Sequence, residues 1–176
     1  MPRVAPSRGD RDRHPFAPPA RVAVIATAAA ILSAFHLLAL AIGLPAVVLR
    51  ALALREASDP TALRRVFAAD AAWGFAALLW LATGPVRAFG PFEKGATFYL
   101  SSPLFHAKLG LFLAVFALEI APMAGLIRWR MALGRGESPD VGAARLFGIL
   151  SWIEAALVVA IVFVAAFMAR GFGLAR

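Results

Sequence analysis

Four long apolar segments constrain this chain more than any other feature of its sequence. Residues 22–49 contain no Asp, Glu, Lys or Arg, and residues 67–86, 104–127 and 146–168 are nearly as apolar. A helix needs about 20 apolar residues to cross the hydrocarbon core of a bilayer, and each segment is long enough to do so. We therefore predict an all-α fold, a four-helix transmembrane bundle over residues 22–170 that lies in the lipid bilayer.

The composition also favours a membrane protein over a soluble domain. Hydrophobic residues make up 61% of the chain and charged residues 16%, whereas soluble domains average about 45–50% and about 25%. The absence of cysteine excludes disulfides and thiol catalysis, and the sequence contains no phosphate-binding glycine loop or nucleophile elbow. The first segment exceeds the apolar part of a signal peptide, which is about 7–15 residues long, so we expect it to be retained as a helix.

The formal net charge of +8 is spread along the flanks of the segments and does not form one patch. Residues 1–21 are rich in proline and arginine, which predicts a disordered basic tail. The loops 50–66 and 128–145 carry four arginines each, and we predict that they face the cytoplasm. Because no basic face forms, nucleic-acid binding is not expected.

A few ionisable side chains interrupt the apolar segments, and each is a functional candidate because its burial in lipid is costly. A rise of about 1.5 Å per residue places His36 at the centre of its segment. Glu119 and Glu154 fall about 5 Å from their midpoints, towards the same side, so they can share a proton or a hydrogen bond. With His36 they form a predicted midplane cluster, suited to a proton relay or a polar cofactor pocket. The alternative is that His36 is a hydrogen-bonded packing residue.

Three other ionisable residues lie nearer the ends of their segments. By the same count, Asp70 lies about 10 Å from the midpoint of its segment, on the same side as the two glutamates. Lys108 and His106 lie about 11 and 14 Å from the midpoint of their segment, on the opposite side. Asp70 and Lys108 are therefore at very different depths, and an ion pair between them is not expected. Local alternatives are that Asp70 pairs with Arg64 or Arg65, that Lys108 extends to the interface, and that His106 is solvated or caps its helix.

Proline and aromatic residues mark the connections. Ser102 and Pro103 predict the start of the third membrane helix, and Pro85 predicts the end of the second. The loop 87–103 is rich in aromatic residues, including Tyr99. This loop either caps the mouth of the bundle or anchors the chain in the membrane interface, where aromatic residues are enriched.

Several short motifs resemble a known family. Residues 95–108 read GATFYLSSPLFHAK, residues 128–130 read RWR, and residues 168–173 read MARGFG. Together with Leu37 and Leu38 after the first-segment histidine, these stretches resemble an uncharacterised bacterial family of predicted membrane proteins, over about residues 30–173. The resemblance implies a multi-pass membrane protein and no particular activity.

A more distant resemblance is to the small membrane-embedded protoporphyrinogen oxidases of bacteria, which are haem-binding helical proteins. It rests on residues 34–37 (AFHL), residues 106–109 (HAKL), and a glutamate at 154 followed by alanine. The resemblance implies that haem b binds through His36 as its metal ligand, and that Lys108 is functionally important.

The chain departs from the oxidase pattern in two places. Glu119 stands where the oxidases tend to carry a histidine, and the Asn and Pro around the later glutamate are missing. His36 and His106 differ by roughly 14 Å in depth, so they are not expected to bind one haem together. A haem here would have His36 as its single histidine ligand.

Three functions fit these residues. In the first, the chain is a redox protein that acts on a porphyrin or quinone, with haem at His36, substrate held by Lys108, and protons moved by two glutamates. In the second, Glu119 and Glu154 couple a transporter or accessory subunit to protons; four helices are few for a transporter, so a homo-oligomer is expected. In the third, the polar residues only join the helices of a structural or assembly protein. The candidate catalytic residues are Lys108, Glu119 and Glu154.

Overall fold

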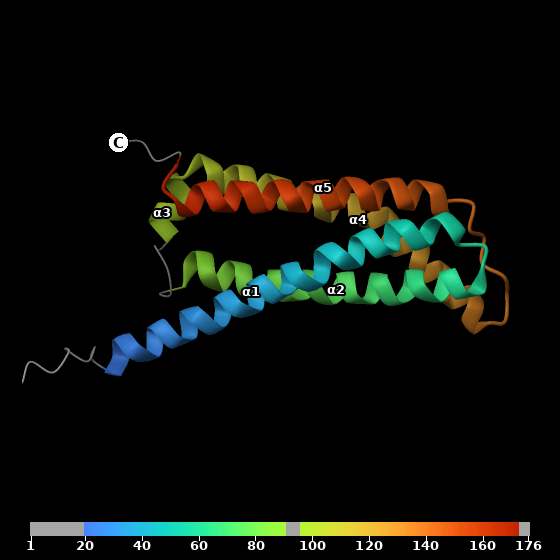
Figure 1. Ribbon diagram of the computed structural model, residues 1–176, viewed down its shortest axis with the longest axis horizontal. Coiled ribbons are helices and arrows are strands. Elements are labelled where there is room, and N and C mark those ends of the chain that lie inside the picture. The colour runs from blue at the N-terminus through green and yellow to red at the C-terminus, as the bar shows by residue number, and fades with distance from the viewer. Residues whose placement is uncertain (1–19, 91–95, 173–176) are drawn as a thin grey trace, which may run out of the picture.

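The computed structural model describes residues 20–90 and 96–172, in which four long helices run antiparallel to their neighbours along the chain (Figure 1). The elements are α1 (Ala20–Ala53), η1 (Leu54–Glu56), α2 (Pro60–Phe89), α3 (Ala96–Ser101), α4 (Pro103–Gly134) and α5 (Ala144–Ala169). Each long helix contains one predicted span and is long and apolar enough to cross a membrane. The predicted all-α bundle is confirmed. The predicted basic tail lies outside the described residues, except for Ala20 and Arg21, which begin α1.

Proline residues mark the starts of α2 and α4, and at α2 an aspartate caps the helix. A side-chain oxygen of Asp59 accepts a hydrogen bond from the Ala62 backbone N–H at 2.7 Å, and Pro60 follows in the first turn. Such an acceptor satisfies a backbone donor that has no partner within the helix. At the second start, Ser102 precedes α4 and Pro103 is its first residue, as the sequence predicts.

The prediction that α2 ends near Pro85 is wrong, because the helix continues to Phe89. Proline is tolerated within membrane helices, and aromatic packing holds the last turn in place. The ring centroid of Phe89 lies 6.4 Å from that of Phe105, which in turn lies 5.3 Å from that of Tyr99. Tyr99 is buried, so the described part of the loop 87–103 packs on the end of the bundle.

Three pairs of long helices pack directly against each other. α1 packs against α2 and α5, and α4 packs against α5. The side between α2 and α4 is bridged by polar side chains: Trp73 of α2 donates to Glu119 of α4, and Arg130 of α4 donates to Asp70 of α2. Figure 1 shows that the N-terminal part of α1 diverges from α5 and extends beyond the other helices.

Buried apolar side chains form two clusters. The loop-end cluster, near η1, consists of Leu54, Ala57, Leu63, Val66, Leu126, Trp129, Ala144 and Phe147. The mid-bundle cluster consists of Ala46, Val47, Trp73, Val115, Ala155 and Val158. Glycines allow close approach in this region: the Phe147 ring lies where a Cβ on Gly125 would be, and a Cβ on Gly43 would lie 3.0 Å from the side chain of Ala76.

Burial is concentrated in the half of the bundle that contains both clusters, which we call the η1 half; the opposite half is the α3 half. Buried residues begin at Ala39 on α1 and at Val115 on α4, and they end at Val158 on α5. On α2 they are also most frequent in the η1 half, although Thr83 and Ala88 are buried in the α3 half. Large apolar side chains are exposed in the α3 half, among them Phe35, Leu38, Leu109, Leu113, Phe163 and Phe167. Lipid chains are as apolar as leucine, so this surface is suited to contact with a bilayer.

Candidate functional site

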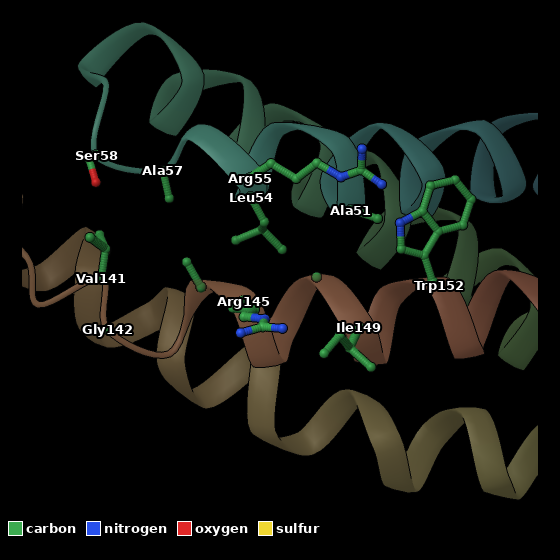
Figure 2. A pocket seen from close by; sticks show the side chains of 12 residues that line it. Ala51, Leu54, Arg55, Ala57, Ser58, Val141, Gly142, Arg145, Ile149 and Trp152 are labelled. Carbon is green, nitrogen blue, oxygen red and sulfur yellow. The ribbon is translucent and has the colours of Figure 1, made fainter.

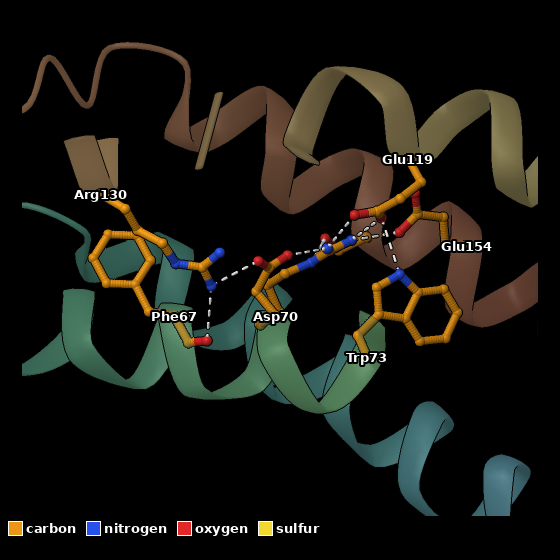
Figure 3. A network of polar contacts seen from close by, with 8 residues as sticks. Phe67, Asp70, Trp73, Glu119, Arg130 and Glu154 are labelled. Atoms are coloured by element: carbon orange, nitrogen blue, oxygen red, sulfur yellow. Dashed lines mark hydrogen bonds and ion pairs between the residues drawn. The ribbon is translucent and has the colours of Figure 1, made fainter. Parts of the chain in front are cut away.

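The guanidinium group of Arg50 joins all four long helices. Arg50 lies on α1 with 0% of its side chain exposed, inside a network of polar contacts shown in Figure 3. Its Nη1 donates to Asp70 Oδ1 at 2.9 Å and to Glu119 Oε1 at 2.8 Å. Its Nη2 donates to Glu119 Oε2 and to Glu154 Oε2, both at 2.7 Å, and its Nε donates to Ser151 Oγ at 3.0 Å. We call these five residues the Arg50 network.

All five N–H groups of this guanidinium therefore have an acceptor. A guanidinium offers five donors in a fixed planar arrangement, and Glu119 takes two of them in the bidentate geometry typical of strong arginine–carboxylate pairs. Complete pairing matters because a charge buried without partners costs several kcal/mol. The acceptors come from α2, α4 and α5, so the network holds Arg50 only when all four helices are assembled.

Two further residues extend the network towards the surface. Trp73 Nε1 donates to Glu119 Oε2 at 3.0 Å, and Arg130 Nη2 donates to Asp70 Oδ2 at 2.8 Å. Arg130 also donates to the Phe67 carbonyl oxygen at 3.0 Å and lies 5.0 Å from the centroid of the Phe67 ring, within cation–π range. The exposed side-chain fraction falls from 39% at Arg130 to 11% at Asp70. A chain of hydrogen bonds thus leads from the surface to the buried guanidinium.

Glu154 is the most enclosed of the three acids. Its side chain is 0% exposed, compared with 18% for Glu119. One oxygen, Oε2, accepts from Arg50, but the buried Oε1 has no hydrogen-bond partner among the described residues. Because leaving a buried polar atom unpaired is costly, this oxygen is a position where a proton or another small ligand can bind.

The Arg50 network lies between the two apolar clusters. On α1, Val47 of the mid-bundle cluster and Leu54 of the loop-end cluster lie about one turn before and after Arg50. On α5 the order is reversed. Phe147 of the loop-end cluster comes before Ser151 and Glu154, and Ala155 of the mid-bundle cluster follows them. Apolar layers on both sides exclude water, and electrostatic interactions are stronger in such surroundings.

His36 forms a second polar site, about 21 Å from Arg50 in rise along α1. Its Nδ1 lies 2.8 Å from Thr83 Oγ1, and the Thr83 hydroxyl donates to the Leu79 carbonyl oxygen at 2.7 Å. Because that hydroxyl has a single proton, we assign Nδ1 as the donor and Nε2 as the nitrogen with the lone pair. The predicted midplane cluster of His36 with two glutamates does not form, because α1 extends beyond the other helices (Figure 1) and Arg50 meets the glutamates instead.

Lys108 and His106 lie in the first turns of α4, remote from the Arg50 network. Lys108 precedes Glu119 by a rise of about 16 Å. His106 Nδ1 lies 3.0 Å from the Ser102 carbonyl oxygen. This is a local contact within the first turn, and it is not a helix cap because it satisfies no free backbone N–H group. Of the four candidate site residues, the structure brings only Glu119 and Glu154 together.

Arg50 and Arg130 are the main site residues that sequence reasoning misses, because it assigns both to loops. The predicted pairing of Asp70 with Arg64 or Arg65 is wrong for the same reason: Arg50 and Arg130 donate to the two Asp70 oxygens. One signal points to Arg50, since the apolar run continues for a full turn after it. No comparable signal in the sequence marks Arg130.

An exposed ion pair in the connection between α4 and α5 contrasts with the buried network. Arg135 Nε and Nη2 donate to the two oxygens of Glu137 at 2.9 and 2.7 Å. This hydrogen bonding lowers the pKa of Glu137 below its usual value and raises the pKa of Arg135. Among residues 20–90 and 96–172, no three His, Asp or Glu side chains are grouped in a way that could hold a metal ion.

The helices and the buried network define the class of this chain, a multi-pass α-helical membrane protein with four candidate spans. Residues 28–173 match the family described as "Predicted membrane protein (DUF2214)", and the chain belongs to that family. This confirms the resemblance to a family of predicted membrane proteins. No curated protein and no solved structure matches the chain.

Proposed function

We propose that this chain is a proton-coupled membrane protein, a transporter or an accessory subunit, in which the Arg50 network binds and releases one proton. The observation that carries the proposal is the carboxyl group of Glu154, which is fully buried and has one oxygen without a partner among the described residues. A proton is the smallest ligand that satisfies such a group.

The charges of the network support binding of a single proton. Asp70, Glu119 and Glu154 carry three negative charges when ionised, and Arg50 and Arg130 supply two positive charges. One proton makes the group neutral, which is the least costly state inside a membrane. Glu119 and Glu154 also accept from the same nitrogen of Arg50, so a proton on either one relieves repulsion between them.

The polar side between α2 and α4 supplies the route for that proton. Glu119 is partly exposed there, and its carboxyl group accepts from the same Arg50 nitrogen as that of Glu154. Because the two carboxyl groups are neighbours, Glu119 receives the proton first and passes it to the buried acid. Trp73 holds Glu119 in position from α2, and Asp70 with Arg130 joins the two helices nearer the surface. The flanking apolar clusters block a continuous path of water, so proton passage is coupled to movement of these helices.

Assembly and location form part of the same proposal. Four helices are few for a transporter, so we propose a homo-oligomer. The arginine-rich loops 50–66 and 128–145 lie at the same end of the bundle. Following the charge rule for membrane loops, we place them in the cytoplasm and the bundle in a bacterial inner membrane.

Infrared spectroscopy of the purified full chain tests the proton site directly. A pH titration should reveal one protonated carboxylic acid in the wild type, and Glu154→Gln should abolish its band. The matched control is Glu137→Gln, which removes an exposed acid from the loop after α4 and should leave the band unchanged. In proteoliposomes, pH-dependent flux should be lost in Glu154→Gln and in Glu119→Gln. A Glu154→Gln protein that keeps both the band and the flux would contradict the proposal.

His36 supports a second candidate, a haem-binding redox protein that acts on a porphyrin or quinone. Haem b would supply one-electron chemistry, and His36 would hold it. The hydrogen bond from Nδ1 to Thr83 supports this role, because metal-binding histidines usually donate their other ring N–H and are held in orientation by it. Lys108, in the first turns of α4, would hold an anionic substrate group.

An absorption spectrum of the purified protein tests this second candidate. Protein from haem-replete cells should show a Soret band and a pyridine haemochrome, and His36→Ala should lose both. His106→Ala is the matched control, since His106 contacts the backbone of its own helix, and it should keep the spectrum. A colourless wild-type protein from such cells would rule the haem proposal out without affecting the proposal for Glu154.

A further inference from the structure

An open groove lies along the contact between α1 and α5, at the end of the bundle where η1 joins α2 (Figure 2). Its wide part has a volume of about 530 Å³, and the lining residues include Arg55, Ser58, Arg145, Ile149 and Trp152. A second pocket of about 390 Å³ continues along the same two helices, lined by Leu44, Val48, Trp152, Ala155, Ala156 and Val159. Trp152 lines both, so the two pockets are neighbours along α1 and α5, and we treat them as the polar end and the apolar end of one groove.

Small residues make this groove possible. Ala51 and Gly148 lie between the helices at the polar end, and a Cβ on Gly148 would lie 3.6 Å from the Ala51 carbonyl oxygen. Ala155 and Ala156 line the apolar end, where larger side chains would fill the space. The two helices therefore approach closely at Gly148, and the groove lies beside this contact.

The polar end carries two cations. Arg55 extends from η1 and Arg145 from α5, on opposite walls of the groove (Figure 2). Both are exposed, and within residues 20–90 and 96–172 neither donates a hydrogen bond to another side chain or forms an ion pair. This distinguishes them from Arg50, Arg130 and Arg135, which all have carboxylate partners. The two guanidiniums are thus available to an anion, and arginine matches phosphate geometry well.

The length and depth of the groove match a lipid. From Arg145 to Val159 on α5 the rise is about 21 Å, compared with about 15 Å for half of a hydrocarbon core about 30 Å thick. The charged end lies beside the loops, where headgroups are found, and the apolar end points towards the middle of the bundle. Trp152 lies between them and is partly exposed, as is typical of tryptophan at the membrane interface.

We propose that this groove binds one anionic phospholipid, with its phosphate between Arg55 and Arg145 and one acyl chain along Leu44, Val48 and Val159. Basic pockets between membrane helices recognise anionic headgroups in this way. The site is separate from the Arg50 network, and the proposal does not depend on the function proposed above.

Lipid retention by the purified full chain tests the site. Protein is exchanged into mixed micelles that contain phosphatidylglycerol or phosphatidylcholine with identical acyl chains, and the bound lipid is quantified by mass spectrometry. We expect wild type to prefer phosphatidylglycerol by about thirtyfold, the scale of two basic side chains near a headgroup. The double variant R55Q/R145Q should lose this preference. The matched control R64Q/R65Q removes two exposed arginines at the same end of the bundle, outside the groove, and should retain it.

A variant at the apolar end separates a lipid from a free anion. Ala156→Phe keeps both arginines and fills the acyl-chain part of the groove, so retention of phosphatidylglycerol should fall about tenfold. Inorganic phosphate at millimolar concentration should not displace the lipid. The proposal is overturned if R55Q/R145Q prefers phosphatidylglycerol as strongly as wild type, if Ala156→Phe binds it unchanged, or if phosphate alone displaces it. Because Ala156→Phe alters only the lipid-facing surface, it decides the question even where the double arginine variant folds poorly.

Discussion

The η1 half and the α3 half of the bundle consist of similarly apolar sequence, yet their helices pack differently. In the η1 half, Gly125 and Gly43 lie against the side chains of neighbouring helices, and the Arg50 network joins all four helices. In the α3 half, Gly84 and Gly110 have open space where a Cβ would be, and no described residue of α1, α4 or α5 is buried there. Because lipid is as apolar as leucine, apolar character alone does not drive membrane helices together. Small residues and polar contacts make the difference.

The largest effect is expected from Arg50→Met, which removes the group that joins the helices of the η1 half. Three carboxyl groups would lose their common partner, and breaking a buried ion pair in this way costs about 3–5 kcal/mol. The free energy of unfolding in mixed micelles measures the effect. Arg64→Met is the control, because Arg64 is exposed, and it should change stability by less than about 0.5 kcal/mol. Equal stability of the two variants would show that the network does not hold the bundle together.

A matched pair of leucines on α4 tests the two halves directly. Leu126 is fully buried in the loop-end cluster, whereas Leu113 is 58% exposed in the α3 half. Leu126→Ala should cost about 2–3 kcal/mol through the cavity it leaves, and Leu113→Ala less than about 0.5 kcal/mol because lipid fills the space. Unfolding measurements compare the two variants. A large loss for Leu113→Ala would instead show that the α3 half is covered by a second protein surface.

Two glycines of α4 should respond with opposite signs. Gly125→Ala places a methyl group where the ring of Phe147 lies, and such overpacking costs about 1–3 kcal/mol. Gly110→Ala meets open space and should stabilise the helix by up to about 1 kcal/mol, because alanine has the higher helix propensity. Thermal melting of both variants in one detergent checks the signs. Destabilisation by Gly110→Ala would mean that another chain packs closely against the α3 half.

The smallest effect is expected outside both halves, at the exposed pair of Arg135 and Glu137. Hydrogen bonding to Arg135 lowers the pKa of Glu137, so the pair stabilises the fold above the usual glutamate pKa. That contribution is lost as the pH falls through the lowered pKa of the folded protein. An NMR titration should show Glu137 titrating below its usual range, and Arg135→Gln should return it to that range. If Glu137 titrates normally in the wild type, the pair does not persist in solution.

The sequence predicted the helices and only part of the site. Long uncharged runs such as residues 22–49 are sufficient to predict spans, because a bilayer admits few structures other than helices of that length. Glu119 and Glu154 could be identified because mid-span carboxylates are costly. Their partner Arg50 is assigned to a loop, because an arginine near the end of an apolar run is equally typical of a membrane flank, although the run continues for a full turn after it. Its role depends on four helices meeting at one point.

By itself, the sequence determined that this chain forms four membrane helices, because hydrophobic length and local start signals act within one segment. Only the tertiary structure decided which residues meet. The relative shift of α1 brings Arg50, and not His36, to the level of Glu119 and Glu154, while Arg130 reaches across from α4 to Asp70. Such contacts depend on how far each helix is displaced along its axis, and that displacement is set by packing between helices, which no single segment encodes.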